Sequence, residues 1–302
     1  MQISDELNSR FAIPGVVKID PGSGGLTRVV INSGGGAAHV YLHGAHVTHY
    51  QPRGQEPVLF LSQKSNFAPG KAIRGGVPVI FPWFGPKANE PSAPMHGFAR
   101  VLDWELTQTR QISGDTVIAQ FELKPNDATR AAWPHDFRLQ YEVAVGPTLA
   151  LTLRVTNAGK AGIHFEEALH NYLAVGDVRS ARIDGLAGRR FIDKVDGMRA
   201  KIQPPGPIRI EAETDRVYLD TEDAVTVSDT VLLRALRVEK QGSRSTVLWN
   251  PWIAKAKAMA DFGDEEWPRM LCVETANVAE NAIVLQPGEV HTMRAQISVS
   301  RE

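Results

Sequence analysis

The chain has 302 residues, of which 43% are hydrophobic and 22% are charged, and its 33 basic and 34 acidic residues leave a formal net charge of -1 at pH 7. This balance excludes nucleic-acid or membrane binding through bulk charge, so a bound anion would need a local cluster of cations. The single cysteine, Cys272, excludes an intrachain disulfide and a multi-cysteine metal site.

The N-terminal residues Met1 to Leu7 have no basic segment followed by an apolar one, and no apolar run long enough to span a membrane occurs later. Neither secretion nor membrane insertion is therefore expected, and a lone cysteine is typical of a reducing compartment. We expect a cytoplasmic protein that binds a small molecule and has neither nucleic-acid nor membrane partners. A monomer is expected, and a dimer stays open.

Alternation of apolar and polar residues predicts strands through most of the chain. The pattern begins within 36–50 and is clearest in the middle, where every second residue is apolar over 117–123, 137–145 and 149–155. Gly146-Pro147-Thr148 predicts a hairpin turn between the last two runs. Further strand patterns follow at 224–228, 231–240, 245–248, 270–274 and 291–299.

Helical patterns are few. Short helices are expected at 127–132 and 252–261, and the Pro/Gly segment 203–207 predicts a loop. Strands with one apolar face bury it by packing sheet against sheet, so we predict an all-β fold, a large antiparallel β-sandwich. No linker or internal repeat divides the chain, and a single domain over residues 1–302 is expected, with its core at about 25–299.

The first chemical signal is the stretch from Ile73 to Pro86 and on to Arg100. It places the guanidinium groups of Arg74 and Arg100 among glycines, prolines and aromatic residues, which favour shaped loops over helices. Arginine pairs with phosphate oxygens two at a time, and aromatic faces suit a sugar ring. The stretch therefore predicts a phosphosugar site, with possible ring contacts from Phe81, Trp83 and Phe84.

Three further polar segments follow, at 167–173, 213–218 and 272–277. In this order, and together with the segments 249–252 and 285–289, they resemble the glucose-6-phosphate 1-epimerases, the hexose-phosphate branch of the aldose 1-epimerase (galactose mutarotase-like) superfamily. The resemblance covers roughly residues 30 to 298. It implies a large antiparallel β-sandwich, in agreement with the independent strand pattern.

The same resemblance assigns residue roles. It places the catalytic histidine at His170 and the catalytic carboxylate at Glu274. The substrate-binding positions that it implies are Arg74, Arg100, Asp215, Met95 and His96. Met95 stands where a glutamine is expected and Asn171 where threonine is commoner, and both differences bear on substrate preference.

The chemistry also follows without the family. Interconversion of the α and β anomers of an aldose removes the C1 hydroxyl proton and delivers a proton to the ring oxygen, after which rotation and reclosure give the other anomer. One base and one acid suffice, and no cofactor is needed. We assign Glu274 as the base and His170 as the acid, with Asp215 orienting a hydroxyl. The expected substrate is a hexose 6-phosphate, first of all glucose 6-phosphate.

Plainer interpretations stay open. The enzyme could act on another aldose or phosphosugar, or the sandwich could bind or sense carbohydrate without catalysis. Arg74 and Arg100 could pair at the surface with Asp103 or Glu105. In the same way, Asp215 could be the ion-pair partner of Arg216, and Glu274 could end a strand in solvent.

Two other signals are not expected to carry chemistry. His39, His43, His46 and His49 lie close together, with His164 and Glu166 as further donors, but their spacing matches no structural zinc pattern, so no metal is expected. Cys272 lies two residues from Glu274, whose charge would suppress the thiolate. It is expected to be a small buried side chain.

Overall fold

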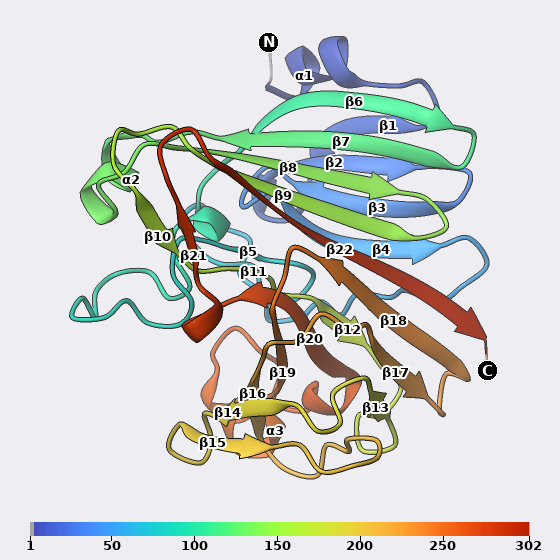
Figure 1. Cartoon of the computed structure of the whole chain (residues 1–302). Coiled ribbons are helices and arrows are strands. Elements are labelled where there is room, and N and C mark those ends of the chain that lie inside the picture. Colours follow the sequence, from blue (N-terminus) through green and yellow to red (C-terminus); the bar gives the residue numbers. More distant parts are fainter. Residues whose placement is uncertain (1–2, 302) are drawn as a thin grey trace.

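Strands are the main regular structure of the computed structural model, which describes residues 3–301, and antiparallel pairing joins them into four sheets (Figure 1). Met1, Gln2 and Glu302, which belong to the domain expected from the sequence, lie outside the described residues. The predicted all-β sandwich is confirmed. The α-helices between residues 3 and 301 are short: α1 (Ile3–Phe11), α2 (Asp127–Ala132) and α3 (Trp252–Ala258).

One eight-stranded sheet contains the long central strands and has the order β13-β17-β18-β22-β9-β8-β7-β6. Its strands in chain order are β6 (Glu105–Ser113), β7 (Thr116–Leu123), β8 (Phe137–Val145), β9 (Leu149–Asn157), β13 (Arg182–Asp184), β17 (Val225–Asp229), β18 (Arg234–Gln241) and β22 (Val290–Arg301). The alternating runs of the sequence form strands of this sheet. In β9, for example, Leu151 and Leu153 are buried, whereas Arg154 is exposed.

The other eight-stranded sheet has the order β15-β14-β16-β19-β20-β11-β5, with β12 also paired to β20. Its strands are β5 (Val79–Ile80), β11 (Glu167–Leu169), β12 (Tyr172–Ala174), β14 (Arg190–Asp193), β15 (Arg199–Ile202), β16 (Thr214–Leu219), β19 (Ser245–Asn250) and β20 (Met270–Asn277). Every residue of β19 and β20 is buried. Both faces of this sheet are therefore covered at its centre.

Two smaller sheets complete the fold. One is four-stranded, with β1 (Val17–Pro21), β2 (Thr27–Asn32), β3 (Gly36–Tyr41) and β4 (His46–Pro52) in order, and the other pairs β10 (Ile163–Phe165) with β21 (Ile283–Leu285). The short 3-10 turns are η1 (Ser23–Gly25), η2 (Ala99–Val101), η3 (Trp267–Arg269) and η4 (Ala279–Asn281). Side chains from β2, β9 and β20, among them Ile31, Leu151 and Val273, belong to one continuous buried cluster.

The register of β20 places the residues of interest together. Leu169 pairs with Thr275 and Tyr172 pairs with Cys272, so His170 falls opposite Glu274. On the other side of β20, Trp249 is paired with both Cys272 and Asp215. Directly opposed residues share a face, as do residues two apart on one strand. Asp215, Trp249 and Glu274 therefore lie on one face of the sheet.

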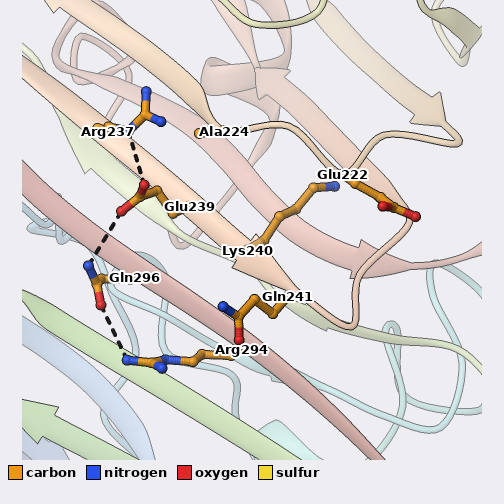
Figure 2. Close-up of a pocket in the computed structure, with 8 residues that line it drawn as sticks. All are labelled: Glu222, Ala224, Arg237, Glu239, Lys240, Gln241, Arg294 and Gln296. Carbon is orange, nitrogen blue, oxygen red and sulfur yellow. Dashed lines mark hydrogen bonds and ion pairs between the residues drawn. The ribbon is translucent and has the colours of Figure 1, made fainter.

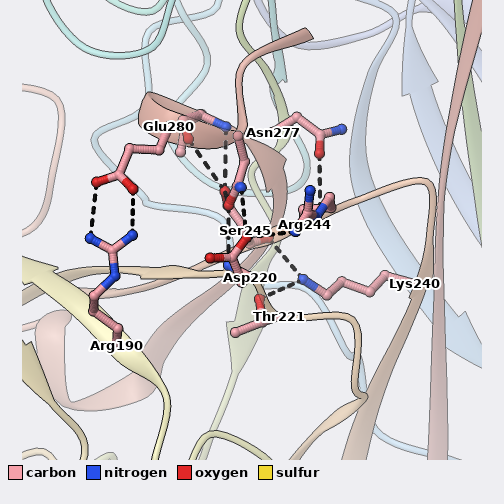
Figure 3. A network of polar contacts seen from close by, with 10 residues as sticks. Arg190, Asp220, Thr221, Lys240, Arg244, Ser245, Asn277 and Glu280 are labelled. Carbon is pink, nitrogen blue, oxygen red and sulfur yellow. Dashed lines mark hydrogen bonds and ion pairs between the residues drawn. The ribbon is translucent and has the colours of Figure 1, made fainter.

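A polar network holds the far ends of β19 and β20 (Figure 3). The Arg244 backbone N–H donates to the Asn277 side-chain oxygen at 2.9 Å, and the Arg244 guanidinium donates to Asp220 at 2.7 Å. The Lys240 ammonium donates to the hydroxyl of Thr221 and to the Ser245 carbonyl, each at 2.9 Å. These contacts link the strand ends of the sheet at the end away from Trp249.

The structure differs from the sequence expectations in local detail. The pattern at 36–50 forms two strands, because a turn intervenes in which Gly44 has φ 74° and leaves no room for a Cβ, which would lie 2.7 Å from the Arg100 carbonyl. The pattern at 231–240 becomes a strand only from Arg234, since the Asp229 carboxylate accepts the N–H groups of Val231 and Leu232 in a turn. The helix expected at 252–261 ends at Ala258, and α1 was not expected.

None of the helices between residues 3 and 301 combines the length and the apolar character that crossing a membrane requires.

The link between β20 and the segment that carries His170 gives a stability prediction. The buried Asn171 side chain donates to the Val273 carbonyl at 3.0 Å. Asn171→Ala removes this bond and is expected to lower the free energy of unfolding by about 1–3 kcal/mol. Urea denaturation measures the change, with Asn66→Ala at an exposed position as control. Equal stability of both variants would contradict the role given to Asn171.

Candidate active site

A pocket of about 270 Å³ opens where β16, β19 and β20 meet the loops before and after β5 and the loop after β14. It brings together seven of the residues singled out in the sequence: Arg74, Phe84, Met95, His96, His170, Asp215 and Glu274. The remaining lining residues are Gly85, Pro86, Tyr172, Lys194, Trp249, Lys255 and Met259. Arg100 and Trp83, which were also singled out, are not part of the lining.

His170 and Glu274 contact each other inside this pocket, with 3.2 Å between Nε2 and Oε1. Glu274 is 1% exposed and His170 is 6% exposed, and the Tyr172 ring stacks on the imidazole at 4.6 Å. His170 Nδ1 and Glu274 Oε2 have no hydrogen-bond partner among the described residues. An imidazole and a carboxyl therefore converge with one free polar atom each.

The two groups are pushed toward their neutral forms. Burial, and next the charge of Asp215, raises the pKa of Glu274 well above its usual range. Burial, and next the charge of Arg100, lowers the pKa of His170 well below its usual range. Each group therefore favours its neutral form, and because the two are in contact their titrations are coupled.

Arg74 is held by two neighbours. Its Nε and Nη2 donate to one oxygen of Asp261 at 3.2 and 3.1 Å, and its Nη1 donates to the Tyr172 hydroxyl at 3.0 Å. Burial alone would lower the pKa of Arg74, but Tyr172 and Asp261 outweigh it, so the group stays charged. A guanidinium has five N–H donors, so one donor on Nη1 and one on Nη2 are left for a ligand.

Arg100 lies below the pocket. Its side chain is 7% exposed, Nη2 donates to the Met95 carbonyl at 2.7 Å, and Nε has no hydrogen-bond partner among residues 3–301. Burial, and next the charge of Arg74, lowers its pKa to about 10, so it remains charged at neutral pH. No carboxylate in the described part of the chain lies within ion-pair distance of it. Its charge acts on the pocket through the protein interior.

The loop that carries Phe84 and His96 forms one wall. His96 Nδ1 accepts the Gly85 N–H at 3.1 Å, and its ring lies edge-on to Phe84 at 4.7 Å. Burial, and next Arg100, lowers the pKa of His96 well below its usual range, so the neutral ring carries its proton on Nε2. Gly97 closes this loop with φ 74°, where a Cβ would lie 2.0 Å from the Phe81 carbonyl.

Asp215 also lines the pocket, together with a residue that the sequence did not indicate. The Lys194 ammonium lies 3.1 Å from Asp215 Oδ2. Burial raises the pKa of Asp215, although Lys194 opposes the shift. Lys194 belongs to no motif and reaches the site only because β14 pairs with β16. Tyr172 and Trp249 lie in segments already noted, but their place in the lining also depends on register.

The plainer interpretations of the charged residues do not describe the structure. Arg74 pairs with Asp261, whereas Asp103 pairs with His43. The ion-pair partner of Asp215 is Lys194, and Glu274 is buried in the pocket.

The remaining aromatic candidates lie elsewhere. The Trp83 indole N–H donates to the Pro94 carbonyl at 3.0 Å, and its ring faces Lys87. Phe81 is fully buried in the main core cluster. Phe84 is thus the aromatic residue of the first stretch that reaches the pocket.

The histidine cluster is spread over separate contacts. The rings of His39 and His49 lie 4.9 Å apart, and His46 Nε2 contacts the Gly75 carbonyl at 2.7 Å. Within residues 3–301, no group of three or more His, Cys, Asp or Glu side chains is arranged to hold a metal ion. Cys272 is buried, and burial together with Glu274 raises the pKa of its thiol well above the usual range.

A second pocket, of about 300 Å³, lies over β18 and β22 (Figure 2). Four of its polar side chains bond to one another, since Arg237 donates to Glu239, Gln296 donates to Glu239, and Arg294 donates to Gln296. None of the residues predicted for the site lines it. It therefore does not compete with the pocket that contains His170 and Glu274.

The raised pKa of Glu274 gives a stability prediction with a definite sign. A carboxyl whose pKa rises on folding destabilises the protein increasingly as the pH rises from its unfolded pKa toward its folded pKa. Glu274→Gln removes that ionisation. It is expected to raise the free energy of unfolding, and to raise it more at pH 8 than near pH 5.

Urea denaturation at the two pH values measures this effect, with Glu265→Gln at an exposed position as control. A Glu274→Gln protein that is less stable than the unaltered chain at pH 8 would contradict the environment assigned to this carboxyl.

Comparison with known proteins gives a consistent result. The aldose 1-epimerase family model matches residues 27–298. A protein of Escherichia coli K12, provisionally named glucose-6-phosphate 1-epimerase, is 37% identical over 286 residues, which cover 93% of this chain and 95% of that protein. A protein of the plant Cenchrus ciliaris with the same provisional name is also 37% identical, over 91% of this chain and 85% of its own length.

Solved structures show the same likeness. The crystal structure of a provisionally assigned mutarotase from Salmonella typhimurium superposes with a TM-score of 0.90 at 32% identity, and the match covers 100% of each chain. The structure of a galactose mutarotase-like protein from Clostridium acetobutylicum gives a TM-score of 0.73 at 13% identity, over 95% of this chain and 98% of that one. The second likeness shows the shared fold.

Proposed function

Because the chain belongs to the aldose 1-epimerase family, we propose that it is an isomerase that interconverts the α and β anomers of a hexose 6-phosphate, with glucose 6-phosphate as the preferred substrate. The observation that carries the proposal is the His170–Glu274 contact of 3.2 Å inside a pocket that Arg74 also lines. An acid, a base and a cation for phosphate thus lie within reach of one sugar.

The reaction starts from a pair that holds one proton. Transfer of that proton from Glu274 to His170 across their contact gives a carboxylate and an imidazolium. Glu274 then takes the C1 hydroxyl proton while His170 gives its proton to the ring oxygen, and the bond between C1 and that oxygen breaks to leave an aldehyde. Rotation about C1–C2 and the reverse transfers close the ring on the other face. The proton count of the pair is restored, and the chemistry requires no cofactor.

The phosphate is assigned to the cationic side of the pocket. Arg74 is fixed by Asp261 and Tyr172 and keeps two N–H donors free, which suits two phosphate oxygens. Arg100 adds a positive charge without a carboxylate partner among the described residues, below the Met95 carbonyl. We assign Arg74 to direct contact, and Arg100 to attraction of the dianion from beneath the pocket.

The sugar ring is assigned to the space lined by Asp215, His96 and Phe84. Asp215 offers a carboxylate to a hydroxyl, and the neutral His96 ring offers an Nε2 proton to an oxygen. Phe84 presents an apolar face. Met95, half exposed at the rim, has no side-chain donor for the substrate and contributes shape.

The proposal keeps the cytoplasm as the compartment and the monomer as the working form, with a dimer as the alternative. A reducing compartment suits a chain whose single cysteine is buried. A small phosphosugar is the proposed partner, and neither nucleic acid nor membrane is part of the proposal.

Removal of either member of the pair tests the acid–base roles. His170→Asn and Glu274→Gln are each expected to slow glucose 6-phosphate anomer exchange about 10²–10⁴-fold. For the unaltered enzyme, kcat/KM should be bell-shaped in pH, since a second proton on the pair removes the base and loss of its proton removes the acid. Each substitution should abolish one limb. NMR magnetisation exchange measures the rates.

His164→Asn and Glu265→Gln, at exposed positions, are the matched controls and should retain full activity. If the unaltered protein exchanges anomers no faster than buffer does, the chain is a carbohydrate-binding sandwich and the enzyme proposal is wrong.

The phosphate assignment predicts a substrate-dependent effect. Arg74→Met should raise KM for glucose 6-phosphate at least about tenfold, because a charge-assisted pair is worth roughly 1.5–3 kcal/mol. Any activity on free glucose should change far less. Arg53→Met, at an exposed position, is the control for loss of an arginine. Equal effects of Arg74→Met on both sugars would refute a phosphate contact at this residue.

A further inference from the structure

We propose that Lys194 is a positioning residue for the anomer interconversion: its ammonium group fixes the Asp215 carboxylate at the wall of the pocket and balances the charge of the two carboxyl groups that face the sugar. The inference rests on the function proposed above. It assigns a role to a side chain that no sequence motif indicated.

Two separate contacts attach Lys194 to Asp215. The Lys194 backbone N–H donates to the Asp215 carbonyl at 2.9 Å, and its ammonium lies 3.1 Å from Asp215 Oδ2. The residue before it is also fixed, because the Asp193 carboxylate binds Lys201 at 2.8 Å and accepts backbone N–H groups in the turn that follows. The start of the Lys194 side chain is therefore held in place, which favours one orientation of the Asp215 carboxylate.

The ammonium also contacts an aromatic ring of the pocket. It lies 5.3 Å from the centre of the Phe84 ring, within the range of a cation–π contact. Phe84 lines the same pocket and lies beside His96. Lys194 thus contacts both Asp215 and Phe84, two of the side chains assigned to the sugar ring.

Lys194 differs from the other cations that line this pocket. The partner of Arg74 is Asp261 and the partner of Lys255 is Glu213, and neither acid is part of the lining. The partner of Lys194 is itself a lining carboxylate. Of the lining cations, it is therefore the one whose charge directly compensates an acid assigned to the sugar.

The electrostatic surroundings agree with this role. Asp215 raises the pKa of Glu274, whereas Lys194 lowers the pKa values of Glu274 and Asp215. The other titratable and charged groups around the pocket, taken from every element that packs on it, are Arg74, His96, Arg100, His170, Tyr172, Glu213, Lys255, Asp261 and Cys272. Without Lys194, Asp215 would have no counter-ion in direct contact among the described residues and would retain a proton to higher pH.

The test compares Lys194→Met, Lys194→Arg and a control, Lys64→Met. Lys64 forms an ion pair with Asp264 at 2.6 Å outside this pocket. In Lys194→Met, the acidic limb of kcat/KM for glucose 6-phosphate should move about one pH unit upward, because both carboxyls hold protons more tightly. The value of kcat should fall about tenfold or more. Lys194→Arg should restore most of kcat and most of the original position of the acidic limb. Lys64→Met should change neither kcat nor the acidic limb.

Carbon-13 NMR titration of the Asp215 and Glu274 carboxyls gives a readout that does not need activity. The Asp215 titration should move to higher pH in Lys194→Met and stay in place in Lys64→Met. If Lys194→Met does not fold by circular dichroism, Lys194→Gln takes its place.

The outcomes separate the two proposals. An unaltered protein without epimerase activity overturns the proposed function and with it the role in the reaction, whether or not Asp215 titrates as expected. An active protein whose Lys194→Met variant keeps the original pH profile and kcat overturns the Lys194 role alone. A rise in KM for glucose 6-phosphate, with neither the pH profile nor activity on glucose altered, would make Lys194 a phosphate ligand and also overturn it.

Discussion

The antiparallel register along β20 is the constraint on which the site depends. The pairs Leu169–Thr275 and Tyr172–Cys272 leave His170 facing Glu274, although about a hundred residues separate them in the chain. A shift of one residue would turn every side chain of the strand to its other face. Asn171, which bonds to Val273, and the polar network at the far strand ends both oppose such a shift.

Burial controls the protonation of the His170–Glu274 pair. An isolated carboxylate or imidazolium in such surroundings would be costly, so the pair favours a single shared proton. The cations around the pair differ in their ion-pair partners. Arg74 pairs with Asp261 and Lys194 pairs with Asp215. Arg100 has no carboxylate in ion-pair contact within residues 3–301. Positive charge therefore remains near the pocket for an anionic substrate, while the acid–base pair stays electrically neutral.

Much of the fold and many of the pocket residues could be predicted from the sequence. Period-two alternation predicted the central strands because one face of that sheet is solvated, and the ordered motifs indicated the pocket residues His170, Asp215 and Glu274. Lys194 was missed because its place depends on the pairing of β14 with β16, which leaves no local signal. The burial of Arg100 was equally inaccessible, since neighbours such as Tyr172, Asp261 and Glu274 come from distant parts of the sequence. Phe84 and Trp83 looked alike as sequence, and only Phe84 reaches the pocket.

A crystal structure with bound glucose 6-phosphate tests the central claim most directly. The account predicts a pyranose whose C1 hydroxyl lies within hydrogen-bond distance of Glu274, whose ring oxygen lies within that distance of His170, and whose phosphate contacts Arg74. A sugar phosphate bound with C1 away from both His170 and Glu274, or seated in the pocket over β18 and β22, would contradict it.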